Sequence, residues 1–72
     1  MLQEIAIGQS GHVAFVIWDD ETMDLTVGFR GGQTYRYEKV PGNVANGFAQ
    51  ALSPGAYLNS FIKGSYTYER TA

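Results

Sequence analysis

The residues of this sequence whose types and spacing could do chemistry lie mainly in its last quarter. The stretch SPGAYLNSFIKGSYTYER, residues 53–70, combines aromatic rings, a side-chain amide and cations, and it has no acidic residue before Glu69. Aromatic rings stack on flat ligands, and cations hold phosphate groups through charge-assisted hydrogen bonds. This combination predicts a surface that binds a planar, negatively charged ligand.

Helical spacing divides this stretch into a buried side and a ligand side. We expect Phe61, Ile62 and Tyr66 to anchor the tail in the core. Ser53 is a good helix N-cap, and the free amides that follow it would favour an anion, although such a residue is often only a cap. Arg36 would complete the cleft from a neighbouring subunit. The predicted ligand-binding residues are Arg36, Ser53, Gly55, Tyr57, Asn59, Lys63 and Arg70.

Several of the candidate residues have a purely structural alternative. Tyr35 and Tyr37 share one strand face and could form a stacking platform, but rings that precede a helix in need of packing are more often core residues. Arg36 lies on the opposite face of that strand, which is either solvated or covered by a ligand or a second subunit. Lys63 and Arg70 could be solvated surface charges.

Nothing in the chain predicts catalysis or a metal site. His12 stands alone at the start of a predicted strand, with no Ser or Cys nucleophile motif beside it. Asp19, Asp20 and Asp24 lack the Gly and distal Glu of a calcium loop, so we interpret them as an acidic turn. The absence of Cys excludes a disulfide and an ordinary zinc site. We therefore expect a protein that is not an enzyme and has no metal and no cofactor.

The length and charge of the chain limit its partners. The 72 residues predict a single domain, residues 1–72, with so thin a core that self-association is the remaining way to stabilise it. A net charge of −2 is unsuited to a long phosphate backbone, whereas five Lys and Arg residues suffice for one or two phosphates. No apolar run is long enough for a membrane span and no signal peptide is evident, so we expect a cytoplasmic protein.

The first half of the chain predicts three antiparallel strands. Residues 12–18 are apolar at both odd and even positions, which predicts a strand covered on both faces. Residues 25–30 alternate between apolar residues and small or polar ones, the pattern of a half-buried strand. Two glycines at 31–32 then reverse the chain, and residues 34–40 alternate again as a third strand.

A first helix is predicted after the third strand. Pro41 suits its first turn, because proline has no amide hydrogen to lose there. Gly47 weakens the helix without breaking its pattern. Apolar residues recur with the spacing of one helical face at Val44, Phe48, Ala51 and Leu52.

A second helix is predicted at residues 54–63. Ser53 caps it, Pro54 occupies its first position, and Gly64 stands where a left-handed residue is expected to end it. Residues 65–71 would lie along the sheet as an edge or irregular strand. The predicted fold is thus α+β: a three-stranded antiparallel β-meander followed by two helices and a short C-terminal extended segment.

The order of these pieces resembles the KTSC family. The segment VGFRGGQTYRYEKVP, an amphipathic helix and the segment SPGAYLNSFIKGSYTYER follow one another as in that family, over about residues 13–70. Its members are small domains named after the C-terminal segment of some lysyl-tRNA synthetases, and many occur as short stand-alone proteins in phages. The chain departs from the family pattern at Ala56, Leu58, Ser65 and Thr67. The matching positions are Phe29, Gly32, Tyr35, Tyr37, Val40, Pro41, Ser53, Gly55, Tyr57, Asn59, Ile62, Tyr66 and Tyr68.

These observations predict a noncatalytic binding protein for a small nucleotide. If the chain is phage-encoded, as the resemblance implies, it would act in the host cytoplasm as a sponge that sequesters a nucleotide immune signal, such as a cyclic nucleotide. Two alternatives stay open: an RNA-binding module, which the synthetase context implies, and a structural module that self-assembles. The apolar strand at residues 12–18 also predicts a homodimer or a larger closed ring, since exposed apolar patches mark interfaces.

Overall fold

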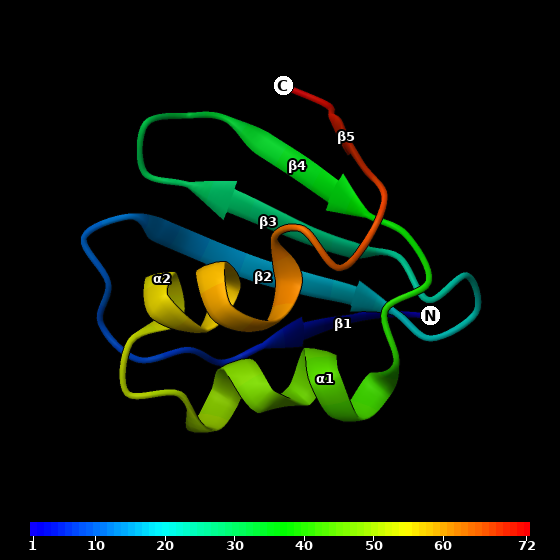
Figure 1. Ribbon diagram of the computed structural model, residues 1–72, viewed down its shortest axis with the longest axis horizontal. Coiled ribbons are helices and arrows are strands. Elements are labelled where there is room, and N and C mark those ends of the chain that lie inside the picture. Colours follow the sequence, from blue (N-terminus) through cyan, green and yellow to red (C-terminus); the bar gives the residue numbers. More distant parts are fainter.

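The structure, a computed structural model that describes residues 1–72, is a five-stranded antiparallel sheet with the helices on one side (Figure 1). The elements are β1 (Leu2–Ile5), β2 (Val13–Asp19), β3 (Leu25–Phe29), β4 (Thr34–Tyr37), α1 (Gly42–Asn46), the 3-10 turn η1 (Gly47–Gln50), α2 (Pro54–Tyr57), the π-helical turn η2 (Leu58–Ile62) and β5 (Tyr68–Arg70). The strands stand in the sheet in chain order, and all the helical segments lie between β4 and β5 in the sequence.

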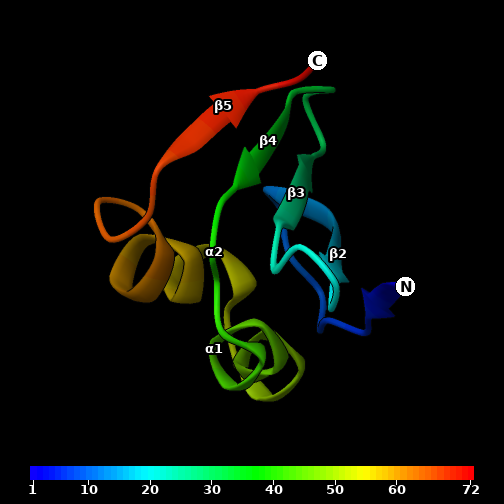
Figure 2. The same ribbon diagram turned by 90° about the vertical axis from the view of Figure 1, so that its right-hand side faces the viewer.

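The core lies between the sheet and the helices, which cover one face of the sheet (Figure 2). Leu25 and Val27 of β3 and Tyr37 of β4 point into it and are at most 1% exposed. Phe48 of η1 and Ile62 of η2 belong to the same buried cluster. The prediction of an α+β fold with helices packed on this face of the sheet is therefore confirmed.

The prediction of a three-stranded sheet is wrong, because the sheet has five strands. The missed strand, β1, pairs antiparallel with β2. Its sequence, LQEI, has two polar residues between the apolar ones, so it lacks the alternation from which a strand could be predicted, and only Ile5 is buried. The C-terminal segment does lie along the edge as expected: in β5, Tyr68 stands opposite Tyr37 of β4.

The strand at residues 12–18 is not covered on both faces as predicted. Val16 points into the core, whereas Phe15 and Ile17 point to the other face, where no helix lies, and are only half-buried. A β-bulge between Val13 and Phe15 shifts the register, so Val13 also reaches the core. We call the helix-free side of the sheet the outer face.

The first helix ends earlier than predicted. Its last helical residue is Gln50, so Leu52 lies beyond it and is fully exposed instead of packed. Pro41 is the N-cap residue and has an extended backbone. Gly47 has a packing role, because a Cβ atom there would overlap the hydroxyl of Tyr57 in α2. The glycine that weakens the helix thus lets the two helical segments approach each other closely.

The second helix begins as predicted but turns differently. Ser53 Oγ accepts a hydrogen bond from Ala56 N at 3.2 Å, which confirms the N-cap. Phe61 is 58% exposed, so the expectation that it anchors the tail in the core is wrong. The cause is the π-helical turn, in which Lys63 N donates to Leu58 O five residues earlier: this wider winding rotates residue 61 away from the buried side. Gly64, with φ 84°, ends the turn as predicted.

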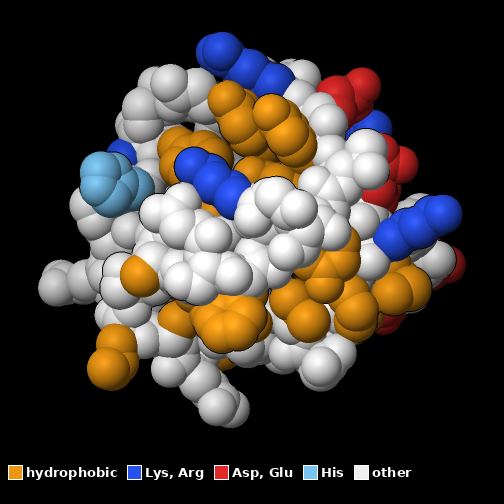
Figure 3. Space-filling model, viewed as in Figure 1, with side chains coloured by type: hydrophobic (Ala, Val, Ile, Leu, Met, Phe, Trp, Pro, Cys, Tyr) orange, Lys and Arg blue, Asp and Glu red, His pale blue; other side chains and the backbone are white.

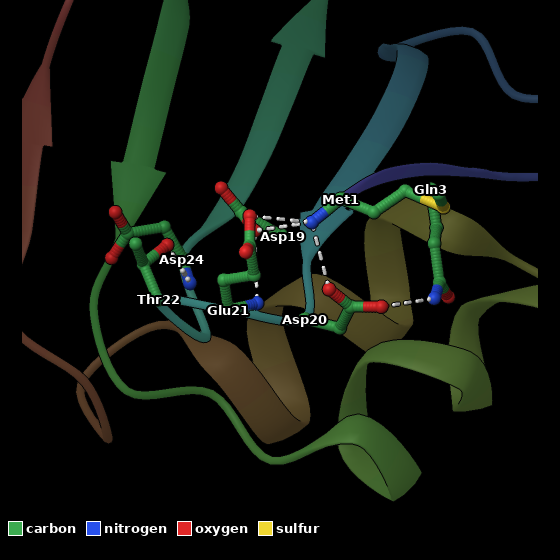
Figure 4. A network of polar contacts seen from close by, with 7 residues as sticks. All are labelled: Met1, Gln3, Asp19, Asp20, Glu21, Thr22 and Asp24. Carbon is green, nitrogen blue, oxygen red and sulfur yellow. Dashed lines mark hydrogen bonds and ion pairs between the residues drawn. The ribbon is translucent and has the colours of Figure 1, made fainter.

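The acidic turn after β2 is built around the N-terminal amino group (Figure 4). The Met1 ammonium donates to Asp20 Oδ1 at 2.8 Å and to Glu21 Oε2 at 2.9 Å, with Asp19 Oδ1 at 3.4 Å. These hydrogen bonds raise the pKa of the amino group to about 10. The backbone hydrogen bond from Glu21 lowers the pKa of the Asp19 carboxyl. No group of three or more His, Asp or Glu side chains is arranged to hold a metal ion.

None of the helical segments has the length and apolar character that crossing a membrane would need.

Candidate functional site

Three adjoining hollows on the molecule share one side chain, that of Lys63. Their volumes are about 370, 430 and 290 Å³. Lys63 follows η2 directly, and its extended backbone carries it out of the helix. Because each hollow shares lining residues with its neighbour, the three form one surface, which we call the Lys63 groove.

The first hollow lies where β2 begins and β3 ends. Antiparallel pairing brings these ends together, and Arg30 N donates to His12 O at 2.8 Å. Arg30 Nε donates to Ser10 O at 2.6 Å, which holds the guanidinium side chain on this side of the turn. Phe29 and Tyr35 form the apolar part of the wall, with their rings edge to face and their centroids 5.7 Å apart.

The second hollow lies at the start of the helix α2–η2. Ser53, Gly55 and Asn59 line it together with His12 and Lys63. The Ser53 hydroxyl already accepts the Ala56 amide hydrogen, so it acts as a cap. The exposed Asn59 side chain makes no hydrogen bond within the chain, which leaves its amide available to a ligand.

The third hollow is walled by tyrosines. Tyr35 and Tyr68 lie nearly parallel, with ring centroids 5.7 Å apart and an interplanar angle of 10°. Tyr68 is 59% exposed, so one side of this pair is open to solvent. Tyr37 closes the floor, and its burial, with the nearby Tyr35 and Tyr68 hydroxyls, raises the pKa of its own hydroxyl. The Tyr37 ring therefore stays neutral at neutral pH.

The Lys63 groove has no acidic lining residue, although the chain as a whole carries a net charge of −2. Lys63 and Arg30 form no ion pair anywhere in the chain. Figure 3 shows Lys and Arg side chains bordering a group of hydrophobic side chains, with no acidic side chain between them, while the acidic side chains lie toward the right-hand margin together with further cations. The groove is thus a local positive and aromatic surface on an acidic protein.

The structure brings four of the seven predicted site residues together and places three elsewhere. Ser53, Gly55, Asn59 and Lys63 all line the second hollow. The other three, which do not line the Lys63 groove, are Arg36, Tyr57 and Arg70.

Each of these three residues has another contact. Arg36 lies on the outer face and pairs with Glu69, with Nη2 2.7 Å from Oε1. The Tyr57 hydroxyl donates to Val44 O at 2.6 Å, and burial raises the pKa of this hydroxyl. Arg70 stands opposite Tyr35 on the helical side of the sheet, and its Nε donates to Ala72 O at 2.9 Å.

The predicted site residues did not include four residues to which the groove gives a role: His12, Phe29, Arg30 and Tyr68. His12 was interpreted as a lone strand-start residue, and Phe29 and Arg30 as the end of a strand. The available signal was the predicted antiparallel pairing itself, because pairing of residues 12–18 with residues 25–30 brings the start of one beside the end of the other.

Comparisons with known proteins find relatives of this sequence and fold. The family model described as KTSC domain matches residues 9–66. A stretch of 53 residues, 74% of the chain, is 38% identical to a lysine–tRNA ligase of Nostoc punctiforme and 40% identical to one of Trichormus variabilis. The chain spans only 9% of the length of these ligases. The crystal structure of a KTSC domain protein from Yersinia pestis matches with a TM-score of 0.87 and 26% identity, and the match covers 100% of both chains.

Proposed function

The chain belongs to the KTSC domain family, and from this premise we propose that it is a noncatalytic binding protein for a small nucleotide, with the Lys63 groove as its site. The observation that carries the proposal is the absence of acidic lining residues from an aromatic groove on an acidic protein. A phosphate in this groove meets cations and no carboxylate, and a base meets open ring faces.

The phosphate part of the ligand would lie between Lys63, Arg30 and His12, which line the first hollow together. Lys63 and Arg30 are not neutralised by acidic partners, so their charge is available to an anion. Two cations match one or two phosphates and not a long backbone, whose binding strength grows with each neutralised phosphate.

The base would stack on the rings that wall the other parts of the groove. Tyr68 offers an exposed ring that is already parallel to Tyr35 behind it. A ring held in this way is preorganised for stacking, a contact worth about 1–3 kcal/mol per base. The Asn59 amide, which both donates and accepts, lines the neighbouring second hollow and would read the edge of the base. The individual hollows, of 290–430 Å³, have the size of small-molecule sites.

The groove supports binding and not turnover. No carboxylate lines it that could pair with His12 as a general acid–base couple, and the Ser53 hydroxyl is occupied as a helix cap. A protein of this kind acts by mass action: it holds the nucleotide and lowers the concentration that is free to reach other proteins. This is the action of a sponge for a nucleotide signal.

A thermal-shift panel tests the proposal. Nucleoside mono- and diphosphates and cyclic mono- and dinucleotides are added to the protein, and the melting temperature is measured, because a ligand that binds only the native state raises it. We expect at least one nucleotide to raise the melting temperature in a concentration-dependent way. If every member of the panel leaves it unchanged at millimolar concentration, the proposal is wrong.

A matched pair of variants then places the ligand. Lys63→Gln removes a cation of the groove, and Lys39→Gln removes an exposed lysine that lines a separate hollow with Glu38 and Thr67. The first should weaken binding by roughly 1.5–3 kcal/mol, the range for a hydrogen bond to a charged group. The second should leave the affinity unchanged, although both lower the net charge of the protein equally.

RNA binding is a second candidate, which the similarity to segments of lysine–tRNA ligases favours. A length series of RNA oligonucleotides distinguishes the two functions. An RNA-binding module gains affinity with each added phosphate contact and loses it steeply with salt. The affinity of a nucleotide site stops rising once the RNA is long enough to fill the groove.

A further inference from the structure

One row of residues crosses the whole sheet on its outer face. The pairing register places Glu4 opposite Ile17, Ile17 opposite Thr26, Thr26 opposite Arg36, and Arg36 opposite Glu69. Directly opposed residues of antiparallel strands point to the same face, so these five side chains form one line from β1 to β5. No helix covers that line (Figure 2).

Beside this row the outer face carries the apolar side chains of Leu2 and Phe15, in line with Asp19 and Thr34. The ring of Phe15 lies across Gly28 of β3, so closely that a Cβ atom on Gly28 would overlap it. Leu2 of β1 is 69% exposed, and Phe15 and Ile17 are half-buried without any helix above them. A ring that lies on the sheet leaves a level surface on which a second sheet can pack at about 10 Å.

The charges of this row are complementary to those of a second copy of the row that runs in the opposite direction. At the β1 end, Glu4 is exposed and has no cationic partner in the chain. Toward the other end of the row, Arg36 of β4 pairs with Glu69 through Nη2 only. The Arg36 Nε atom is shielded from solvent and has no hydrogen-bond acceptor. The Arg36 side chain is nevertheless 42% exposed, so the guanidinium nitrogens at its tip remain open to a carboxylate from outside the chain. Glu4 is a carboxylate without a partner.

We propose that a second copy of this chain covers the outer face in a two-fold symmetric dimer. A symmetry axis that runs along the strands between β2 and β3 places β1 of one copy over β4 of the other. Glu4 of each copy then faces Arg36 of the other, and Ile17 packs over Thr26. The same contact occurs twice, as a two-fold interface requires.

The proposed interface is separate from the Lys63 groove. The groove opens on the helical side of the sheet, so both grooves of the dimer stay open to a ligand. A dimer formed through the outer face is therefore independent of whether the groove binds a nucleotide, and each proposal can fail without the other.

Sedimentation equilibrium over a range of protein concentrations tests the dimer. The wild type should approach twice the chain mass of 7.9 kDa as concentration rises. Glu4→Lys should weaken the dimer roughly tenfold or more, because it places like charges at both contacts. Glu21→Lys makes the same change of charge at an exposed residue of the turn after β2, outside the row, and should leave the dimer unchanged. Circular dichroism checks that each variant is folded.

Mixing two variants gives the decisive result. The double variant Arg36→Glu, Glu69→Lys reverses the charge of the row while it preserves the ion pair within the chain. Alone, this variant and Glu4→Lys should each dimerise at least about tenfold more weakly than the wild type. An equimolar mixture should form a heterodimer with opposite charges at both contacts. A wild type of 7.9 kDa at every concentration would overturn the proposal. So would a mixture that stays monomeric, or a Glu4→Lys protein as dimeric as the wild type.

Discussion

Two neighbouring rows of residues cross the same five strands, one on each face of the sheet. The row on the helical side is Ile5, Val16, Val27, Tyr35 and Arg70, and the row on the outer face is Glu4, Ile17, Thr26, Arg36 and Glu69. The first passes from buried residues to an exposed cation, because the helices stop short of β5 (Figure 2). The second mixes apolar residues with charges of both signs.

Alternate residues of one short strand, β4, contribute to two different surfaces of the molecule. In β4, Tyr35 and Tyr37 serve the core and the Lys63 groove, while Arg36 between them serves the outer face. Arg36 on the outer face forms one ion pair with Glu69, whereas the cations of the groove have no acidic neighbour. Lys63 and Arg30 are therefore available to an anionic ligand without displacing a carboxylate of the chain.

The largest expected effect separates the core from the outer face. Leu25→Ala removes a fully buried side chain and should lower the free energy of unfolding by about 2–5 kcal/mol. Thr26→Ala changes the next residue, which is half-buried on the outer face, and should lower it by less than about 1 kcal/mol. Urea denaturation followed by tyrosine fluorescence measures both. Equal losses would show that the helices do not cover the face to which Leu25 points.

Gly28→Ala probes the flatness of the outer face. The added methyl group overlaps the Phe15 ring, which must leave its place on the sheet, and we expect a loss of about 1–3 kcal/mol in unfolding free energy. Gly11→Ala is the control, because a Cβ atom at Gly11 meets nothing within 4 Å. If the two variants have the same urea midpoint, the Phe15 ring does not lie across β3.

The aromatic wall of the groove can be tested by removing one exposed ring. Tyr68→Ala should weaken nucleotide binding by about 1–3 kcal/mol, the value of one stacking contact. Phe61→Ala removes a ring of similar exposure, 58% against 59%, that does not line the groove. Isothermal titration calorimetry with the nucleotide selected by the thermal-shift panel compares them. Loss of affinity in the Phe61 variant alone would move the stacking site to the helix surface.

The smallest effect concerns the acidic turn. In a chain that begins at Met1, folding raises the pKa of the amino group from 8.0 to about 10. A raised pKa in the folded state means that the ammonium stabilises the fold below pH 8 and that this contribution is lost as the pH rises through 10. We expect N-terminal acetylation to lower the urea midpoint slightly at pH 7 and not at pH 11. A difference that persists at pH 11 would contradict this assignment.

Local patterns in the sequence were sufficient to predict much of the fold. Alternation placed Tyr37 in the core, and the Ser53-Pro54 pair and Gly64 marked both ends of the second helix. These features depend on residues a few positions apart, whose periodicity and capping preferences can be recognised directly.

Features that depend on helix winding or on a bulge could not be predicted. The orientation of Phe61 follows from a π-helical turn that no residue in SPGAYLNSFIKG signals. His12 and Arg30 meet because β2 and β3 pair antiparallel, which the predicted meander already implied, and only the bulge between Val13 and Phe15 had no signal in the sequence. The part of the candidate site formed by residues 53–63 could therefore be predicted from the sequence, whereas the part formed by the strand ends became evident from the structure of the sheet.

NMR distinguishes a nucleotide that binds on the helical side of the sheet from one that binds on the outer face. A nucleotide that raises the melting temperature is titrated into 15N-labelled protein, and amide shifts are followed residue by residue. We expect saturable shifts at the groove residues His12, Arg30, Asn59 and Lys63, and no comparable shifts at Thr26 or Glu69. Shifts that cluster on the outer-face row, with the groove amides unmoved, would contradict this expectation.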